Sequence, residues 1–225
     1  MLASLHDLIG LIFPQVCPGC NRLLLKQEKA ICLHCNSSLP VRLNLNPEEL
    51  QQRFYGRLQL KEAYGFLLFK NKGLTQKLLH SIKYKGNKEL AFELGKMFGT
   101  RCKELNLFSS VDVTVPIPLH ISKLRFRGFN QSAIIAEGLA VGLGIEMNDE
   151  AVIRKVKTTT QTKKTRTERW KNVDNTFELV SSSLENKHVL LVDDVITTGA
   201  TLESCGQTIL NGSTNKLSIG CLALA

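Results

Sequence analysis

The sequence lacks any apolar run approaching the roughly 20 residues that a membrane-spanning helix requires. The first residues, Met1–Phe13, contain Asp7 and lack the basic stretch that opens a secretory signal peptide. Their apolar residues recur at helical spacing and predict a short helix. We therefore expect no membrane insertion and a cytoplasmic location, where cysteines are reduced thiols or metal ligands.

Aromatic residues are scarce, at 6% of the chain, and acidic residues are outnumbered. Phe126, Phe129 and Trp170 are the aromatics within basic stretches, so no stacking platform for single-stranded nucleic acid is evident. The formal net charge is +9, and the segment 154–171 holds eight lysines and arginines against Glu168. This excess favours an anionic partner, and both phosphorylated sugars and nucleic acids qualify.

The segment 189–202 combines an apolar run, two acids and a turn of small residues. Its first four residues, 189–192, predict a buried strand that ends at Asp193 and Asp194. A helix is predicted to open at Ala200 or Thr201. Ligands of open α/β sheets bind at the carboxyl ends of the strands, and the N–H groups of a helix N-terminus suit a phosphate.

The two adjacent carboxylates repel each other in the absence of a ligand. They suit a partner that donates hydrogen bonds or is cationic, such as the vicinal hydroxyls of a sugar, or Mg²⁺. A P-loop ATPase has a similar acidic strand end, but the G-x-x-x-x-G-K-[ST] loop of that class is missing here. The segment predicts a site for a phosphorylated sugar; the alternative is an ordinary strand, turn and helix with solvated acids.

Four of the seven cysteines form two C-x-x-C pairs separated by eleven residues: Cys17, Cys20, Cys32 and Cys35. Two residues between thiolates let both sulfurs reach one Zn²⁺, and four thiolates complete the closed site of a structural zinc ribbon. Disulfides are the alternative, and the expected compartment disfavours them. His34 is expected to point outward, and the remaining cysteines are expected to be core residues.

Strands alternate with helices along the rest of the chain. Apolar periodicity predicts strands near 61–70, 111–115, 189–192 and 216–224, and helices near 75–84, 88–105 and 130–141. This alternation predicts an α/β fold with a mostly parallel sheet flanked by helices. We expect residues 1–40 to hold the N-terminal helix and zinc ribbon, 41–59 a linker with a short helix, and 60–225 the main domain.

The fourteen residues 189–202 resemble the signature of type I phosphoribosyltransferases that binds 5-phosphoribosyl pyrophosphate (PRPP). The resemblance implies that residues 60–225 adopt that fold and that Asp193 and Asp194, the candidate catalytic residues, hold the ribose hydroxyls. The 5′-phosphate would bind the loop formed by Thr197, Thr198, Gly199, Ala200 and Thr201. In the enzymes that salvage 6-oxopurines, an Asp proposed to act on the purine N7 stands at the position of Thr197. That role is absent here, and the sequence identifies no nucleobase pocket.

Three further motifs lie in the order expected of one family. They are Ile82-Lys83-Tyr84-Lys85-Gly86, Val115–His120 continuing to Arg127-Gly128-Phe129-Asn130-Gln131, and Thr160-Gln161-Thr162 with the residues that follow it. Together with the cysteine module they resemble the ComF family of competence-associated proteins over nearly the whole chain. The resemblance implies a role in handling incoming single-stranded DNA, with proteins of the competence machinery as partners.

Phosphoribosyl transfer requires neutralisation of the leaving pyrophosphate, by Mg²⁺ bound with PRPP and by basic side chains. The turn after the strand 111–115 resembles the place where phosphoribosyltransferases bind pyrophosphate, and just beyond it lie Lys123, Arg125 and Arg127. The stretch 158–169 resembles the flexible loop that closes over the site in this superfamily, which makes Arg169 a further candidate. The alternative for each base is a solvated basic face.

Two functions therefore stand side by side. The first is Mg²⁺-dependent transfer of phosphoribose from PRPP to an unknown acceptor, with a role in natural competence and DNA uptake. The second is a non-catalytic accessory protein of transformation that binds PRPP or single-stranded DNA.

Overall fold

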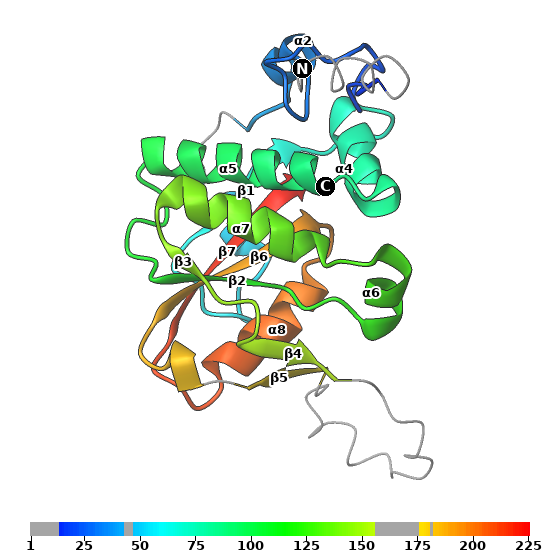
Figure 1. Cartoon of the computed structure of the whole chain (residues 1–225). Helices are drawn as coiled ribbons and strands as arrows, with labels where there is room; N and C mark the ends of the chain where they lie inside the picture. Colours follow the sequence, from blue (N-terminus) through cyan, green and yellow to red (C-terminus); the bar gives the residue numbers. More distant parts are fainter. Residues whose placement is uncertain (1–13, 43–46, 156–175, 181) are drawn as a thin grey trace.

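The computed structural model describes residues 14–42, 47–155, 176–180 and 182–225, and a five-stranded sheet forms its centre (Figure 1). The strand order is β1-β7-β6-β2-β3, and all neighbours in the sheet are parallel. The predicted parallel α/β architecture is thereby confirmed. The strands are β1 (Ala63–Leu68), β2 (Val113–Pro116), β3 (Glu146–Met147), β6 (His188–Ile196) and β7 (Lys216–Leu224).

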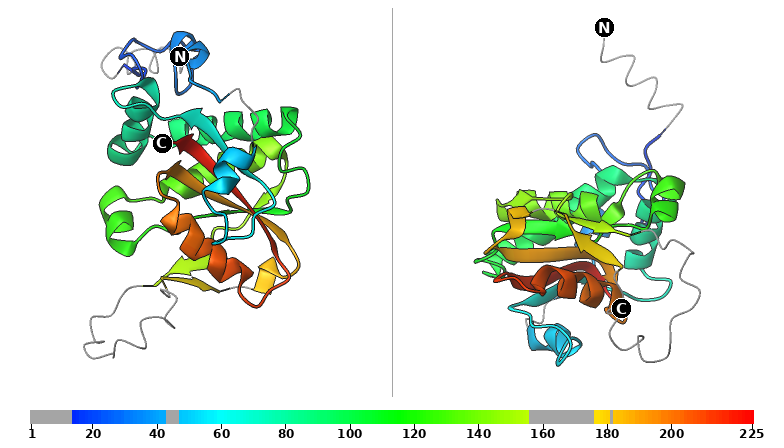
Figure 2. Two further views of the ribbon diagram at one scale, coloured as in Figure 1. Left: turned by 180° about the vertical axis from the view of Figure 1, so that it is seen from behind. Right: turned by 90° about the horizontal axis from the view of Figure 1, so that it is seen from below.

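Helices cover both faces of the sheet, as the views from behind and below show (Figure 2). The core on one face is built with α4 (Leu74–Lys85), α5 (Lys88–Glu104) and α7 (Gln131–Leu143). The core on the other face is built with α8 (Ala200–Leu210) and with residues in and after α3 (Pro47–Gln52). Because β6 is central, its residues 189–192 are fully buried and alternate between the two cores, as an apolar strand between helical layers must.

The two helices α5 and α7 approach each other unusually closely because glycines line their contact. A β-carbon built at Gly95 would overlap the carbonyl oxygen of Ile135, and one built at Gly138 would overlap that of Phe92. Backbone therefore packs against backbone along this helix pair.

The predicted end of the acidic strand is wrong. We expected it to end at Asp193, but β6 continues to Ile196. The reason is its neighbour: β7 extends as far, and Asp193, Val195 and Ile196 of β6 pair with residues 221, 223 and 224 of β7. The two aspartates consequently lie within an extended strand, where successive side chains point to opposite faces.

Residues 41–59 include the short helix that we expected, α3. Leu50 and Phe54 are nonetheless fully buried in the core beside α8. The boundaries of the three expected segments stay predictions, and the expected helix in 1–13 lies outside the described residues.

Shorter elements complete the part of the chain that the structure describes. They are α2 (Leu33–Ser37), α6 (Ile121–Arg127), a 3₁₀ turn (Ser182–Leu184) and the antiparallel pair β4 (Val152–Arg154) and β5 (Phe177–Leu179). Among the described residues, no helix has both the length and the apolar character needed to cross a membrane.

Candidate functional site

The candidate site lies where β6 leads into α8, at the carboxyl edge of the parallel sheet. The strands β6 and β7 point toward the side of the molecule on which α4 and α6 lie (Figure 1). The first residues of α7 and the last turn of α4 reach the two aspartates of β6. Side chains far apart in the sequence therefore meet at this edge.

Asp193 is held by two hydrogen bonds to one carboxylate oxygen. Ser132 Oγ donates to Oδ1 over 2.9 Å, and the backbone N–H of Asp194 donates to the same atom over 2.8 Å. Burial and the neighbouring charge of Asp194 raise the pKa of Asp193 to about 7 against an ordinary value of 3.8, although these donors and Lys83 oppose the rise.

Asp194 lies in a different environment, beside the last turn of α4. Lys83 Nζ is 2.9 Å from Asp194 Oδ2, at ion-pair distance. The same oxygen is buried, and no donor among the described residues gives it a well-formed hydrogen bond. A cation therefore already lies at this oxygen, and the carboxylate keeps further lone pairs that suit a ligand hydroxyl.

The turn between β6 and α8 presents small and hydroxylated residues. Thr197 and Thr198 are exposed, and Gly199 begins the helix with a φ of 80°, a left-handed conformation that favours glycine. The N–H of Ala200 donates to Thr198 Oγ1 over 3.4 Å. Like Ala200, Thr201 is exposed in the first turn, so N–H groups and hydroxyls are available to an anion there.

This turn is braced by the segment after α3. Arg53 Nη1 donates to the carbonyl oxygen of Thr197 over 3.1 Å. The Phe54 ring packs against Gly199 so closely that a β-carbon added to this glycine would lie only 2.8 Å from the ring. The conformation of the turn therefore depends on residues almost 150 positions earlier in the chain.

The predicted basic residues Lys123, Arg125 and Arg127 lie on α6, which has no buried residue. Within the described part of the chain, none of the three forms an ion pair, so their charges are available to a ligand. Arg127 lies over the ring of Tyr84, 5.8 Å from its centroid. Arg169 and the stretch 158–169 fall outside the described residues.

Sequence reasoning did not assign roles to Lys83, Ser132 and Arg53. Lys83 belongs to the motif 82–86 and Ser132 directly follows the motif 127–131, and both motifs were used only for the family resemblance. Arg53 lies in the expected linker, where no pattern singled it out.

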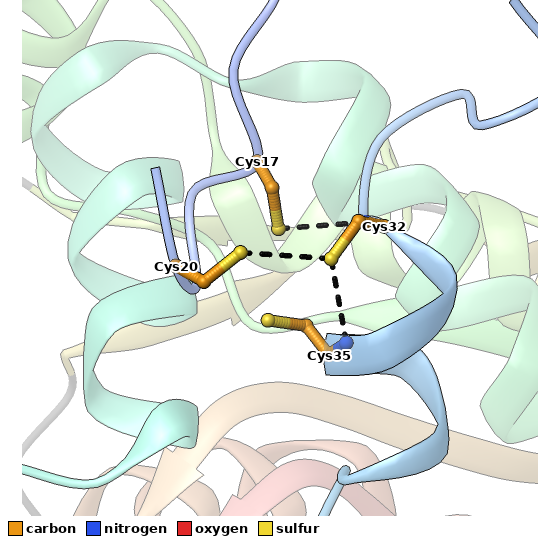
Figure 3. Close-up of side chains that lie close together, drawn as sticks. All are labelled: Cys17, Cys20, Cys32 and Cys35. Carbon is orange, nitrogen blue, oxygen red and sulfur yellow. Dashed lines mark hydrogen bonds between the residues drawn. The ribbon is translucent and has the colours of Figure 1, made fainter. Parts of the chain in front are cut away.

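The four cysteines of the two C-x-x-C pairs meet at one point (Figure 3). Their sulfur atoms all lie within 4.8 Å of one another, and the Sγ atoms of Cys20 and Cys32 are 3.6 Å apart. Tetrahedral Zn²⁺ with Zn–S bonds of about 2.3 Å places its sulfurs about 3.8 Å apart. The donor set and its spacing therefore fit one metal ion.

Backbone donors organise the same cluster. The N–H of Cys32 donates to Cys17 Sγ and the N–H of Cys35 donates to Cys32 Sγ, both over 3.4 Å (Figure 3). His34 is exposed, as expected. Cys102, Cys205 and Cys221 are fully buried, and burial raises the pKa of each thiol, which agrees with their expected place in the core.

The cysteine module rests on the start of α4. Lys77 Nζ donates to the carbonyl oxygen of Gly19 over 3.4 Å, and Leu74 packs against the cysteine cluster. The helix that carries Lys83 to the acidic pair is thus also the support of the first cysteine pair.

Comparison with protein families finds a match of residues 130–225 to the phosphoribosyl transferase domain. This match and the parallel sheet identify the type I phosphoribosyltransferase fold. Among solved structures, glutamine PRPP amidotransferase from Bacillus subtilis, complexed with ADP and GMP, is similar with a TM-score of 0.43 and 20% identity. That likeness covers 58% of this chain and 25% of that chain.

Three curated relatives carry names connected with DNA or competence. The DNA utilization protein YhgH of Escherichia coli K12 is 29% identical over 148 residues, which are 64% of this chain and 65% of that protein. Competence protein F of Haemophilus influenzae is 32% identical over 116 residues, about half of either chain. Competence protein ComFC of Bacillus subtilis is 26% identical over 197 residues, 87% of this chain and 78% of that protein.

The match to the first of these relatives spans less than two thirds of its length. The match to ComFC is the longer one and leaves 13% of this chain uncovered. These relatives, the phosphoribosyl transferase domain and the four clustered cysteines support a protein of the ComF family.

Proposed function

We propose that the chain binds Mg-PRPP at the carboxyl edge of the sheet and transfers its phosphoribosyl group to an acceptor. The observation that carries this proposal is the pair Asp193 and Asp194 beside a phosphate-sized turn at a helix N-terminus. Lys83 lies at one oxygen of the Asp194 carboxylate, and the remaining lone pairs of that carboxylate are the acceptors that a ribose hydroxyl would use.

In this proposal the 2′- and 3′-hydroxyls of ribose donate hydrogen bonds to the two carboxylates. The 5′-phosphate accepts hydrogen bonds from N–H groups of the turn 197–201 and from the hydroxyls of Thr197, Thr198 and Thr201. Mg²⁺ that arrives with PRPP supplies charge neutralisation at the pyrophosphate. The turn and the acidic pair then fix the sugar at both ends, which positions C1 for reaction.

The reaction breaks the bond between C1 of ribose and the pyrophosphate oxygen, and pyrophosphate leaves with that electron pair. A nitrogen of the acceptor forms the new bond to C1. Positive charge develops on the sugar ring, next to the two carboxylates, and negative charge develops on the leaving group. We propose that the negative charge on the leaving pyrophosphate is neutralised by Lys123, Arg125 and Arg127. Arg169, in the stretch 158–169, is proposed as a further contact to the pyrophosphate.

For the cysteine module we propose a structural Zn²⁺ held by Cys17, Cys20, Cys32 and Cys35. Four thiolates leave no position for a substrate or water, so the ion would stabilise the fold of its segment and take no part in transfer.

The names of the relatives support a biological setting for the proposed site. Competence protein F and ComFC are named for competence, and YhgH for DNA utilization. We place the chain in natural competence and DNA uptake, in the cytoplasm, with single-stranded DNA and proteins of the competence machinery as partners.

A second candidate is a non-catalytic accessory role in binding single-stranded DNA, and one observation favours it. Tyr84 is 59% exposed and Phe126 is 78% exposed, and both lie among the bases of α6 and the last turn of α4. Exposed rings beside arginines suit base stacking along a neutralised phosphate backbone. The structure thus offers aromatic surface that was not evident from the sequence.

Calorimetric titration of Mg-PRPP separates these candidates. We expect wild-type protein to bind and an Asp193→Asn/Asp194→Asn variant to lose binding, with an Asp149→Asn variant, altered at an exposed acid elsewhere, as the matched control. Absence of binding by folded, zinc-loaded wild type would contradict the PRPP proposal and leave the accessory role in the lead.

The accessory role is tested with single-stranded oligonucleotides at several salt concentrations. It predicts binding that weakens steeply with salt, because contacts to phosphate dominate. A Tyr84→Ala/Phe126→Ala variant should bind more weakly than a Tyr55→Ala control, which removes an exposed ring beyond α3. Equal affinities of the two variants would exclude this surface.

A further inference from the structure

Lys83, which lies outside the predicted site, makes an ion pair with Asp194 of the acidic pair. It lies in the last turn of α4, which is fixed against the sheet by the buried side chains of Leu78, Leu79 and Ile82. Its own side chain is 23% exposed, and that of Asp194 is 8% exposed. An ammonium group this sheltered, 2.9 Å from a carboxylate, is held by the fold and is not a solvated surface charge.

The acidic pair has few other sources of positive charge. Within the part of the chain that the structure describes, Lys83 makes the one ion pair with Asp193 or Asp194. Ser132 of α7 contributes a neutral donor to Asp193. The thiols of Cys205 on α8 and Cys221 on β7 also face Asp193, and burial keeps both protonated because it raises their pKa.

We propose that Lys83 is a positioning residue of the sugar site: its ammonium group neutralises the acidic pair and holds the Asp194 carboxylate in place for the ribose hydroxyls. This inference rests on the proposed binding of PRPP. Lys83 acts through Asp194 and takes no part in bond formation. Two adjacent carboxylates in a half-buried edge are otherwise driven apart or protonated, and neither state grips a diol.

The position of Lys83 is fixed from the opposite end of its helix as well. Leu74 and Lys77, in the first turn of α4, contact the cysteine cluster and the carbonyl oxygen of Gly19. Gly86 ends the helix directly after Lys85 in a left-handed conformation, with its N–H donating to the carbonyl oxygen of Ser81. Both ends of helix α4 are therefore anchored, which fixes the position of Lys83 relative to the carboxyl edge of the sheet.

The test compares Lys83→Met, which removes the charge and keeps the length, with Lys83→Arg, which keeps the charge. Lys85→Met, at an exposed lysine two residues later, is the matched control. Two measurements are made on full-length, zinc-loaded protein: Mg-PRPP affinity by calorimetry at pH 6, 7 and 8, and the titration of the Asp193 side-chain carbon by NMR without ligand. Circular dichroism establishes that each variant is folded.

We expect Lys83→Met to shift the titration of Asp193 upward by about one pH unit, because the charge of Lys83 lowers the pKa of that carboxyl. Its affinity for Mg-PRPP should fall about fivefold at pH 7 and about twofold at pH 8, where a larger share of the Asp193 carboxyl is ionised in both proteins. Lys83→Arg should restore the titration and most of the affinity, and Lys85→Met should match wild type.

Two results would overturn the inference. One is a Lys83→Met protein that titrates like wild type, and the other is one that binds Mg-PRPP with wild-type affinity at every pH. Failure of the proposed function looks different, since wild type itself would then not bind Mg-PRPP. A lesion that is merely structural would lower affinity equally at all three pH values and would not be repaired by arginine, which also counts against the inference.

Discussion

Ser132 Oγ donates a 2.9 Å hydrogen bond to Asp193 Oδ1, and this bond joins the start of α7 to the acidic strand β6. The two residues are 61 positions apart. Asn130 caps the same helix and its side-chain amide donates to the carbonyl oxygen of Ile117, just after β2. One helix start therefore ties together the ends of two neighbouring strands.

Replacement of Ser132 by Ala should weaken Mg-PRPP binding. The variant loses a donor to a carboxylate, a bond worth about 1.5–3 kcal/mol when the acceptor is charged, so affinity should fall about tenfold or more. Calorimetry at pH 8 measures the change where Asp193 is ionised. A Ser132→Thr variant keeps the hydroxyl and serves as the control; equal loss in both variants would mean that the hydroxyl is not what matters.

Stability without ligand should fall as the pH rises from about 4 to about 7. The pKa of Asp193 is raised from 3.8 to about 7 in the folded protein, so in this window the folded state keeps a proton that the unfolded chain has released. The folded state is therefore favoured at low pH, and that advantage is lost as the pH approaches 7. Urea unfolding of wild type and Asp193→Asn at pH 5.5 and 8 tests this, since the variant should gain stability relative to wild type at pH 8. A pH-independent difference would contradict the shift.

Gly199→Ala should be far more damaging than the same change at Gly212. Both glycines have positive φ, 80° and 68°, so both variants incur the roughly 1–2 kcal/mol cost of a left-handed alanine. Only at Gly199 does the new methyl group also meet the Phe54 ring, while nothing lies within 4 Å at Gly212. Thermal unfolding measures the two losses. Equal decreases in Tm would contradict the prediction, because they would show that the contact between the new methyl group and the Phe54 ring has no cost.

Protein purified without chelator should contain about one zinc ion per chain, and Cys35→Ser should lower that content and the stability of the cysteine module. Cys102→Ser is the control, because Cys102 is buried in the main core and lies outside the cluster. Metal analysis with protease digestion of the first 40 residues measures both effects. Zinc-free wild type that resists proteolysis would contradict the structural site.

The parts of this architecture that depend on local pattern were predictable. The strand 216–224 was predicted with the bounds that it has, and the helices near 75–84, 88–105 and 130–141 were found within about two residues of their ends. The clustering of the four cysteines was similarly predictable, because two C-x-x-C pairs are the typical spacing of a zinc site.

Features that depend on a neighbour were not predictable in the same way. The length of β6 is determined by its ladder with β7, and no pattern within 189–196 contains that information. The contacts of Lys83 with Asp194 and of Arg53 with Thr197 join segments more than 100 residues apart. Lys83 belongs to the motif 82–86, whereas no pattern singled out Arg53, and tertiary structure was needed to say what either residue touches.

The close approach of α5 and α7 has a consequence for exchange of parts between related proteins. The start of α7 holds Ser132 and Asn130 against the sugar edge, while the depth at which the helix sits is determined by glycines such as Gly138 facing the α5 backbone. A chimera that takes one of these helices from a relative with larger residues at the contact would displace the start of α7, and with it the hydrogen bond from Ser132 to Asp193. A working chimera should therefore take α5 and α7 from the same parent protein.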